Sequence, residues 1–157
     1  MKIKSRNVLR KSDEKALFND ITEAFGDASP YNNKKLEYVE TDKWSMIFVD
    51  NEPHLFKIEG VIFPTVKGAL EMKPERRLVK VDAGAVRFVV NGADIMGPGV
   101  VDADPSIKEG DFVIVIEETH GKALAIGKAL VRGDEMAGRK GKVVKSIHYV
   151  GDEIWKL

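Results

Sequence analysis

Short runs of aliphatic and β-branched residues, closely spaced between glycine-bearing turns, fill the second half of the chain. The clearest is DFVIVIEE, residues 111–118, a continuous apolar run with the length of one strand. Similar runs lie at residues 77–84, 122–131 and 142–150. The segment EETHGKA can join two of these runs as a hairpin, because Gly121 tolerates a positive φ. Short strands at this spacing predict a small barrel or sandwich.

One segment of this half fits both a strand and a helix. In AVRFVVNGA, residues 85–93, the alternation of Val86, Phe88 and Val90 is typical of a strand. Val86, Val89 and Val90 also follow helical spacing, and the Asn-Gly pair after them is a suitable helix end. The local pattern alone leaves both structures open.

The first half of the chain predicts a mixed α/β module that begins with an amphipathic helix over residues 12–26. Apolar residues recur at every fourth position from Leu17 to Phe25, which gives this helix one apolar face. We expect Ser12 to cap its start and Gly26 to end it.

The rest of the first half predicts a β-meander, a short helix and a linker. Residues 35–60 alternate apolar and polar side chains and contain a turn at VDNEPH. Residues 63–72 suit a short helix, and the charged KPERR, residues 73–77, suits a linker because Pro74 opposes helix continuation. The sequence therefore predicts two domains, residues 1–73 and 78–157.

Composition excludes several classes of protein. The chain has 157 residues and no cysteine, so disulfides, zinc–cysteine sites and thiol catalysis are ruled out. No window is apolar enough for a membrane span and no signal peptide is evident, so we expect a cytoplasmic protein. The 25 basic and 25 acidic residues give zero net charge, and nucleic-acid binding would therefore require a local basic patch.

No set of residues in the sequence forms a convincing catalytic or metal site. Asp102 and Asp104 lack a third ligand and are better explained as turn residues before Pro105. The three histidines are scattered, and we expect His148 to be a packed or an edge residue of a strand. No phosphate loop or nucleophile–base pair is present. We therefore expect a protein with no catalytic activity, no cofactor and no metal.

The stretch NGADIMGPGV, residues 91–100, has too many glycines for a helix or strand interior. A cluster of this kind is most often a tight turn. The functional interpretation is that glycine lets a ligand approach the backbone closely, with exposed N–H groups donating to phosphate oxygens. Pro98 would stiffen the turn and reduce the entropy lost on binding.

Several of these segments together resemble a PUA domain. They are VDAGAVRFVVNGADIMGPGV, EGDFVIVI, ALAIGKALV and GKVVKSIHYVGDEIW, in that order, and they cover residues 78–157. PUA domains bind RNA in pseudouridine synthases and archaeosine transglycosylases. IHYVGDEIW and VIFPTVKGALE further resemble the MCT group (multiple copies in T-cell malignancy) and its archaeal relatives, which the N-terminal half matches only loosely.

The resemblance implies an α+β fold, an N-terminal mixed α/β module followed by a C-terminal PUA pseudo-β-barrel. It implies that GAVRFVVNGA is a helix. We attribute the helix to tertiary packing of Phe88 and the neighbouring valines, which overrides the weak helix propensity of these residues. It also places Gly92 to Gly99 beside an RNA groove, with Arg87 on the bordering helix and Lys80 on the strand before it.

Two basic clusters without acids could supply the positive patch that a neutral protein needs. The first is the N-terminal segment MKIKSRNVLRK, residues 1–11, and the second is GRKGKVVK, residues 138–145. The predicted RNA-binding residues are Lys80, Arg87, Gly92, Ala93, Gly97, Pro98, Gly99, Arg139, Lys140 and Lys142.

The function that the resemblance implies is RNA binding in translation, directed to tRNA or ribosomal RNA. A translation-factor protein is the expected partner. The alternative is an accessory subunit that delivers an RNA-modification enzyme to its substrate, as PUA domains do when fused to such enzymes.

Overall fold

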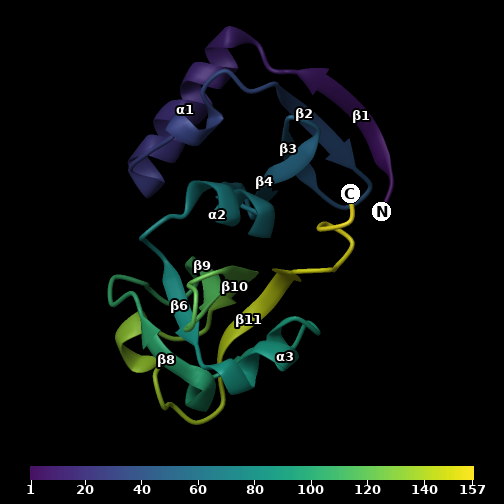
Figure 1. The fold of residues 1–157 in the computed structure, drawn as a ribbon. Helices are drawn as coiled ribbons and strands as arrows, with labels where there is room; N and C mark the ends of the chain where they lie inside the picture. Colours follow the sequence, from purple (N-terminus) through teal and green to yellow (C-terminus); the bar gives the residue numbers. More distant parts are fainter. The chain divides into compact units, whose positions relative to one another are not determined.

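The computed structural model describes all 157 residues, which form two compact units. The first spans Met1–Pro74, and the second spans Glu75–Lys156, with Leu157 grouped with the first. Each unit is built on one sheet, of five strands in the first and six in the second (Figure 1). The predicted α+β class, a mixed module followed by a pseudo-barrel, is confirmed.

The first unit is a five-stranded antiparallel sheet in the order β1-β2-β3-β4-β5. The predicted meander corresponds to β2, β3 and β4, and the β3–β4 turn places Asp50 and Asn51 at positive φ. The elements are β1 (Ile3–Val8), α1 (Lys11–Phe25), η1 (Ser29–Tyr31), β2 (Leu36–Thr41), β3 (Ser45–Val49), β4 (Glu52–Ile58), β5 (Val61–Pro64) and α2 (Val66–Met72).

Helix α1 covers one face of this sheet through its apolar side. Leu17 and Ile21 are buried in a cluster that includes Leu36 and Leu55 of the strands. Gly26 ends the helix as predicted, with a left-handed φ of 88° and its N–H donated to the Thr22 carbonyl. The predicted cap is wrong, because the helix already begins at Lys11. Arg10 takes the capping position and forms no side-chain cap hydrogen bond.

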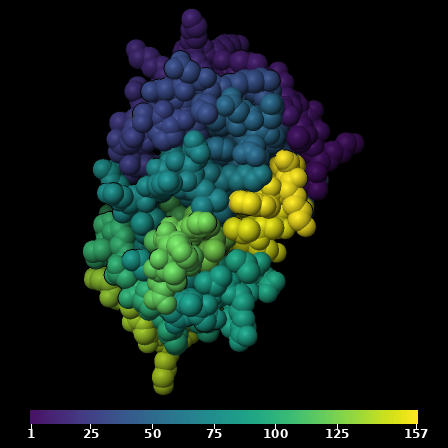
Figure 2. Space-filling model, viewed as in Figure 1, coloured from purple at the N-terminus to yellow at the C-terminus, as the bar shows by residue number.

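Strand β1 was absent from the sequence-based prediction. It pairs with β2 at the edge of the sheet, and all six of its residues are exposed. In Figure 2 the purple side chains of the chain's first residues protrude at the surface. Without a buried face, the segment IKSRNV has no apolar alternation by which a strand could be recognised.

The second unit is a nearly closed pseudo-barrel with the strand order β7-β11-β10-β9-β6-β8. Strand β6 pairs in parallel with β9 and antiparallel with β8, while the hairpin β9–β10 turns through Gly121 at a φ of 69°. The elements are β6 (Leu78–Val81), η2 (Ala83–Ala85), α3 (Val86–Val89), β7 (Ile95–Met96), η3 (Gly97–Gly99), β8 (Val100–Ala103), β9 (Phe112–Glu117), β10 (Ala123–Ala129), η4 (Gly133–Glu135) and β11 (Lys142–Tyr149).

The ambiguous segment is helical, as the resemblance implied. A 3₁₀ turn continues into α3, and the Val90 N–H donates to the Val86 carbonyl at 3.0 Å. Val89 is buried in the barrel core, which favours the helix through tertiary packing. The expected role of Phe88 was wrong, because this side chain is 53% exposed. No helix in either unit combines the length and apolar character required to cross a membrane.

Candidate nucleic-acid interface

A groove of about 670 Å³ opens in the second unit between the η2–α3 segment and the β7–η3 segment. Val89 and Ile95 are buried side chains in its lining. The small residues Ala85 and Ala93 and the backbone of Gly99 also line it. The groove is therefore apolar, with bare backbone along part of its wall.

Two large exposed apolar side chains line the groove. Phe88 of α3 is 53% exposed and Met96 of β7 is 47% exposed. The Arg87 guanidinium carbon lies 4.8 Å from the centroid of the Phe88 ring, at cation–π distance. Exposing a phenylalanine costs free energy in the unliganded protein, so its position suits contact with a ligand.

The charged side chains of the groove are mostly acidic and already engaged. The Asp82 carboxylate accepts the Ala85 N–H at 2.9 Å. The Asp94 carboxylate accepts the Ser146 N–H at 2.9 Å and pairs with Lys142 Nζ at 3.0 Å. Burial alone would raise the pKa of Asp94, but these two interactions outweigh it and lower the pKa. Lys142 therefore contributes little unpaired positive charge.

The two glycines of the Gly-Pro-Gly segment have different structural roles. A Cβ on Gly97 would lie only 1.8 Å from the Arg139 carbonyl oxygen, so the bare backbone allows close packing there. Gly97 is buried and does not line the groove, whereas Gly99 and Pro98 do. A Cβ on Gly99 would meet only the Ala85 methyl group, at 3.2 Å. Neither glycine has a positive φ.

Gly92 belongs to the helix end, next to the groove. Its φ of 89° lets the chain leave α3, and its N–H donates to the Val89 carbonyl at 3.0 Å. A Cβ at this position would lie 2.8 Å from the Tyr149 ring. Gly92 is therefore required for the turn and for packing, and the following residue, Ala93, lines the groove.

The structure gathers only part of the predicted basic set around the groove. Arg87 lies next to Phe88, and Lys142 lines the groove, but Lys80 is not among the lining residues. Arg139 pairs with Glu135 at 3.0 Å, and Lys140 beside it is exposed. The second basic cluster is thus partly neutralised by acids that lie outside its own stretch of sequence.

Sequence reasoning placed the Gly92–Gly99 segment beside the groove but did not name Asp94 or Met96 among the binding residues, and it gave Phe88 a packing role. Both Phe88 and Met96 were consistent with core positions, since aromatic and aliphatic side chains are usually buried. No sequence pattern separates an exposed phenylalanine from a buried one in a four-residue helix.

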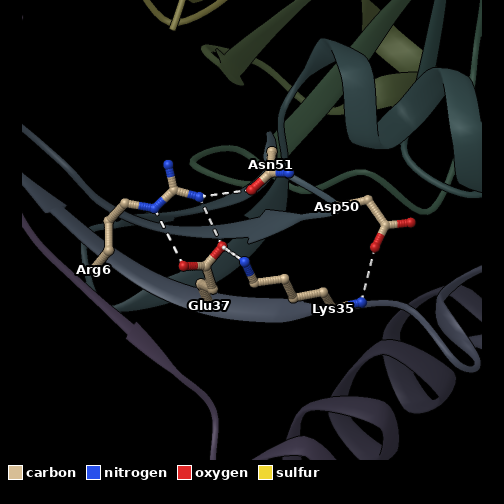
Figure 3. A network of polar contacts seen from close by, with 5 residues as sticks. All are labelled: Arg6, Lys35, Glu37, Asp50 and Asn51. Atoms are coloured by element: carbon tan, nitrogen blue, oxygen red, sulfur yellow. Dashed lines mark hydrogen bonds and ion pairs between the residues drawn. The ribbon is translucent and has the colours of Figure 1, made fainter.

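The N-terminal basic cluster forms part of an ion-pair network within the first unit (Figure 3). The Arg6 guanidinium donates to both oxygens of Glu37, at 2.7 and 3.2 Å, and to the Asn51 side-chain oxygen at 3.1 Å. The hydrogen bond from Arg6 is the main reason that the pKa of Glu37 is lowered. Lys35 also pairs with Glu37, at 3.6 Å. Arg6 therefore holds β1 against β2.

The remaining polar candidates have structural roles. His148 is fully buried in β11, and its Nδ1 lies 2.9 Å from both oxygens of Asp152, which confirms the expected packed histidine. Asp104 accepts N–H groups of Arg77 and Ser106, as expected for a turn residue. The same expectation was wrong for Asp102, which lies in strand β8 opposite Lys80 of β6. No group of three or more histidine or carboxylate side chains is arranged to hold a metal ion.

Comparison with known proteins identifies both units. Residues 78–150 match the PUA domain family, and residues 5–71 match a domain of unknown function, DUF1947. An uncharacterised protein of Methanocaldococcus jannaschii is 44% identical, covering 100% of this chain and 99% of its own. Translation machinery-associated protein 20 of Saccharomyces cerevisiae is 32% identical over 74% of this chain and 68% of its own.

A solved structure agrees with these matches. The crystal structure of a hypothetical protein from Pyrococcus horikoshii has a TM-score of 0.83 and 38% identity, covering 97% of this chain and 98% of its own. The chain therefore belongs to the PUA-domain family of the MCT type, which includes translation machinery-associated protein 20 and malignant T-cell-amplified sequence 1.

Proposed function

We propose that this chain is an RNA-binding protein of the translation apparatus and that its groove takes unpaired bases of tRNA or ribosomal RNA. The observation that carries the proposal is the apolar groove, with exposed Phe88 and Met96 beside the bare backbone at Gly99. Relatives whose names refer to translation support a role in the translation apparatus. In this proposal residues 78–157 are the RNA-binding domain and residues 1–73 the domain that precedes it.

The chemistry of the groove favours a base over a phosphate. A base stacked on an aromatic ring contributes about 1–3 kcal/mol, and every base has a flat face to offer. A phosphate inside the groove would meet the carboxylates of Asp82 and Asp94 in apolar surroundings. Placing a base in the groove differs from the expectation that phosphates approach the glycines. In this proposal the phosphates lie at the rim of the groove.

Positive charge at the rim then orients the RNA backbone. Arg87 and Lys140 are exposed, and Lys142 can exchange its Asp94 partner for a phosphate oxygen. Of the predicted residues, Ala93, Pro98 and Gly99 contact the base, whereas Gly92 and Gly97 act indirectly by shaping the backbone. Lys80, outside the groove lining, and Arg139, already paired with Glu135, are assigned weaker phosphate contacts.

The proposal includes no catalytic step. A translation-factor protein remains the expected partner, and the cytoplasm the expected place of action. Both expectations rest on the translation-associated relatives.

Binding of labelled tRNA to the full chain, measured by fluorescence anisotropy across a salt series, tests the proposal. We expect Phe88→Ala to weaken binding by about tenfold with an unchanged salt slope, because it removes a stacking surface and no charge. Lys140→Ala should reduce the salt slope by about one unit. Val101→Ala is the matched control, since Val101 is exposed on β8 and lies outside the groove. Equal affinities for the Phe88 and Val101 variants would exclude this groove as the RNA site.

A further inference from the structure

Strand β1 leaves one side of its backbone without a partner strand. It lies at the edge of the first unit's sheet, and all six of its residues are exposed (Figure 1). The Leu9 N–H, directly after the strand, donates to the Leu36 carbonyl at 3.0 Å. The register pairs the preceding residue, Val8, with Glu37. Hydrogen-bonded and non-hydrogen-bonded pairs alternate along an antiparallel ladder. The backbone N–H and C=O groups of Val8 and Arg6 therefore point away from β2.

Positive charge lies at both ends of this open edge. Arg6 is held by Glu37, but the other cations of residues 1–11 are exposed and none is engaged in an ion pair. They are Lys2, Lys4, Arg10 and Lys11. Neither acid of β2 is free to balance them. Glu37 is already paired with Arg6 and Lys35. Glu40 accepts a hydrogen bond from the Ser45 hydroxyl at 2.8 Å. A ligand with negative charge near both ends of the strand is therefore favoured.

Exposed aliphatic side chains give the edge an apolar component. Val8 is 67% exposed and Ile3 is 37% exposed. In a β-sheet such side chains pack against neighbours on the adjacent strands, and each favourable cross-strand pair contributes about 0.2–1 kcal/mol. Strand β1 has a neighbour on one side only, the side of β2. The open side therefore presents backbone donors, backbone acceptors and apolar side chains along one edge.

An added β-strand fits this edge better than RNA or a second copy of the chain. A phosphate can accept the outward N–H groups, but it offers no donor to the outward carbonyl oxygens, which repel its charge. A second β1 strand would bring lysines and arginines against each other, and like charges on adjacent strands are destabilising. An extended peptide satisfies the backbone donors and acceptors together, and apolar side chains on it can pack beside those of β1.

We propose that β1 binds an extended, acidic segment of a partner protein, which joins the five-stranded sheet as a further strand. The apolar side chains of this segment pack beside Val8 and Ile3, and its carboxylates lie near the cations at the two ends of β1. None of these residues of β1 lines the groove of the second unit, so the interaction does not depend on the RNA site.

Hydrogen exchange in the full-length protein tests for strand addition. The probe is the capped peptide Glu-Glu-Val-Thr-Val-Glu-Glu, in which acids flank a β-branched centre. On binding, the outward N–H groups of Arg6 and Val8 gain carbonyl partners. At a peptide concentration about four times the dissociation constant, about one fifth of the protein stays free. Exchange of these two amides with water, measured by NMR, should therefore slow by about fivefold.

The neutral peptide Gln-Gln-Val-Thr-Val-Gln-Gln is the matched control for charge, because it keeps the shape of the probe. We expect it to bind about tenfold more weakly, since it loses the exposed ion pairs. Unchanged exchange of the Arg6 and Val8 amides at about 5 mM acidic peptide would overturn the proposal. Equal affinity of the two peptides would also overturn it.

Proline at position 8 tests the backbone contribution. Val8→Pro removes the outward N–H and leaves the β1–β2 ladder its donors, as at the edge positions where sheets carry proline. Val8→Ala keeps the N–H and is the matched control. We expect the proline variant to bind the acidic peptide about tenfold more weakly and the alanine variant about twofold more weakly. Slow exchange of the Asn7 amide, which faces β2, verifies that β1 stays in the sheet. Similar affinities of the two variants would contradict strand addition.

Charge-removing variants locate the ionic contribution. Lys4→Gln and Arg10→Gln should each weaken binding of the acidic peptide by about two- to threefold, as expected for one exposed charge. Lys57→Gln is the matched control, because Lys57 is exposed on β4, which does not adjoin β1. A loss of affinity in the Lys57 variant equal to that in the Lys4 variant would contradict the assignment.

The two other occupants would give different results. Decauridylate and the acidic peptide are compared by the shifts that each causes in the amide signals of residues 3–8. Tighter binding of the RNA than of the peptide would assign this edge to nucleic acid. Slower exchange of the Arg6 and Val8 amides at higher protein concentration, with no peptide present, would assign it to a second copy. Either result overturns the proposal.

Discussion

Replacing Gly97 with alanine should unfold the second unit at much lower denaturant concentration, whereas the same change at Gly99 should have little effect. The added Cβ at position 97 would lie 1.8 Å from the Arg139 carbonyl oxygen and 2.6 Å from its carbon. Both are backbone atoms, which cannot rotate away as a side chain would. The chain around Arg139 must therefore retreat by more than about 1 Å.

The magnitude follows from what that movement disrupts. Overpacking at a rigid position costs about 1–3 kcal/mol. The Gly97 N–H donates to the Gly141 carbonyl at 2.9 Å, and the Gly97 carbonyl accepts the Gly138 N–H at 2.9 Å. Each of these hydrogen bonds contributes about 1 kcal/mol. The expected loss in unfolding free energy is about 3–5 kcal/mol. For Gly99→Ala it is below about 1 kcal/mol, because the Ala85 methyl group can shift.

Urea titration of the full chain, followed by amide NMR signals, measures this difference. Val113 and Val115 report on the second unit, while Val39 and Leu55 report on the first and serve as an internal control. Reading the units separately avoids assuming a single two-state transition. Similar urea midpoints for the two alanine variants in the second unit would refute the steric argument.

Three further changes test other parts of the structure. Thr65→Val should lower the unfolding free energy by about 2–3 kcal/mol in urea titrations, because the buried Thr65 hydroxyl donates to the Pro53 carbonyl and accepts the Gly68 N–H. Burial lowers the pKa of His54, so the unfolded chain binds the proton more readily, and stability should fall as the pH drops through 6.5. Thermal melts should show this loss in the parent and not in His54→Gln. The pKa of Glu37 is lowered from 4.5, so Glu37→Gln should be less stable than the parent at neutral pH. The difference in melting temperature between the parent and the Glu37→Gln variant should disappear as the pH falls below the lowered pKa of Glu37.

Most of the longer elements with a buried apolar face could be predicted from the sequence, whereas the short strands β5, β7 and β8 were not predicted. Helix α1, the meander and the barrel strands β6, β9, β10 and β11 all carry a periodic or continuous apolar pattern, and each forms near its expected position. The helix at Val86–Val89 required the family resemblance, since its valines suit a strand equally well. Strand β1 could not be found, because its stability comes from pairing with β2 and its side chains remain in water.

The site was harder to predict from the sequence, because charged side chains pair with partners that are far away along the chain. Lys142 lies in a basic stretch without acids, yet its partner is Asp94, 48 positions earlier in the chain. Arg6 similarly pairs with Glu37 across 31 positions. Local charge counts therefore overestimated the free positive charge in both basic clusters. Exposure of Phe88 and Met96 is also a property of the folded surface, and composition does not encode it.

The exposed position of β1 has a consequence for how the first unit opens. Detaching this strand uncovers almost no apolar area of its own and breaks its ladder to β2 together with the contacts of Arg6 with Glu37, Asn51 and the Phe48 ring. The free energy of that local opening should be well below the free energy of unfolding the whole unit. Amide protons of residues 3–8 should therefore exchange with solvent sooner than those of β3 and β4. The sheet then exists in two forms, one with five strands and a minor one with four, in which β2 becomes the edge.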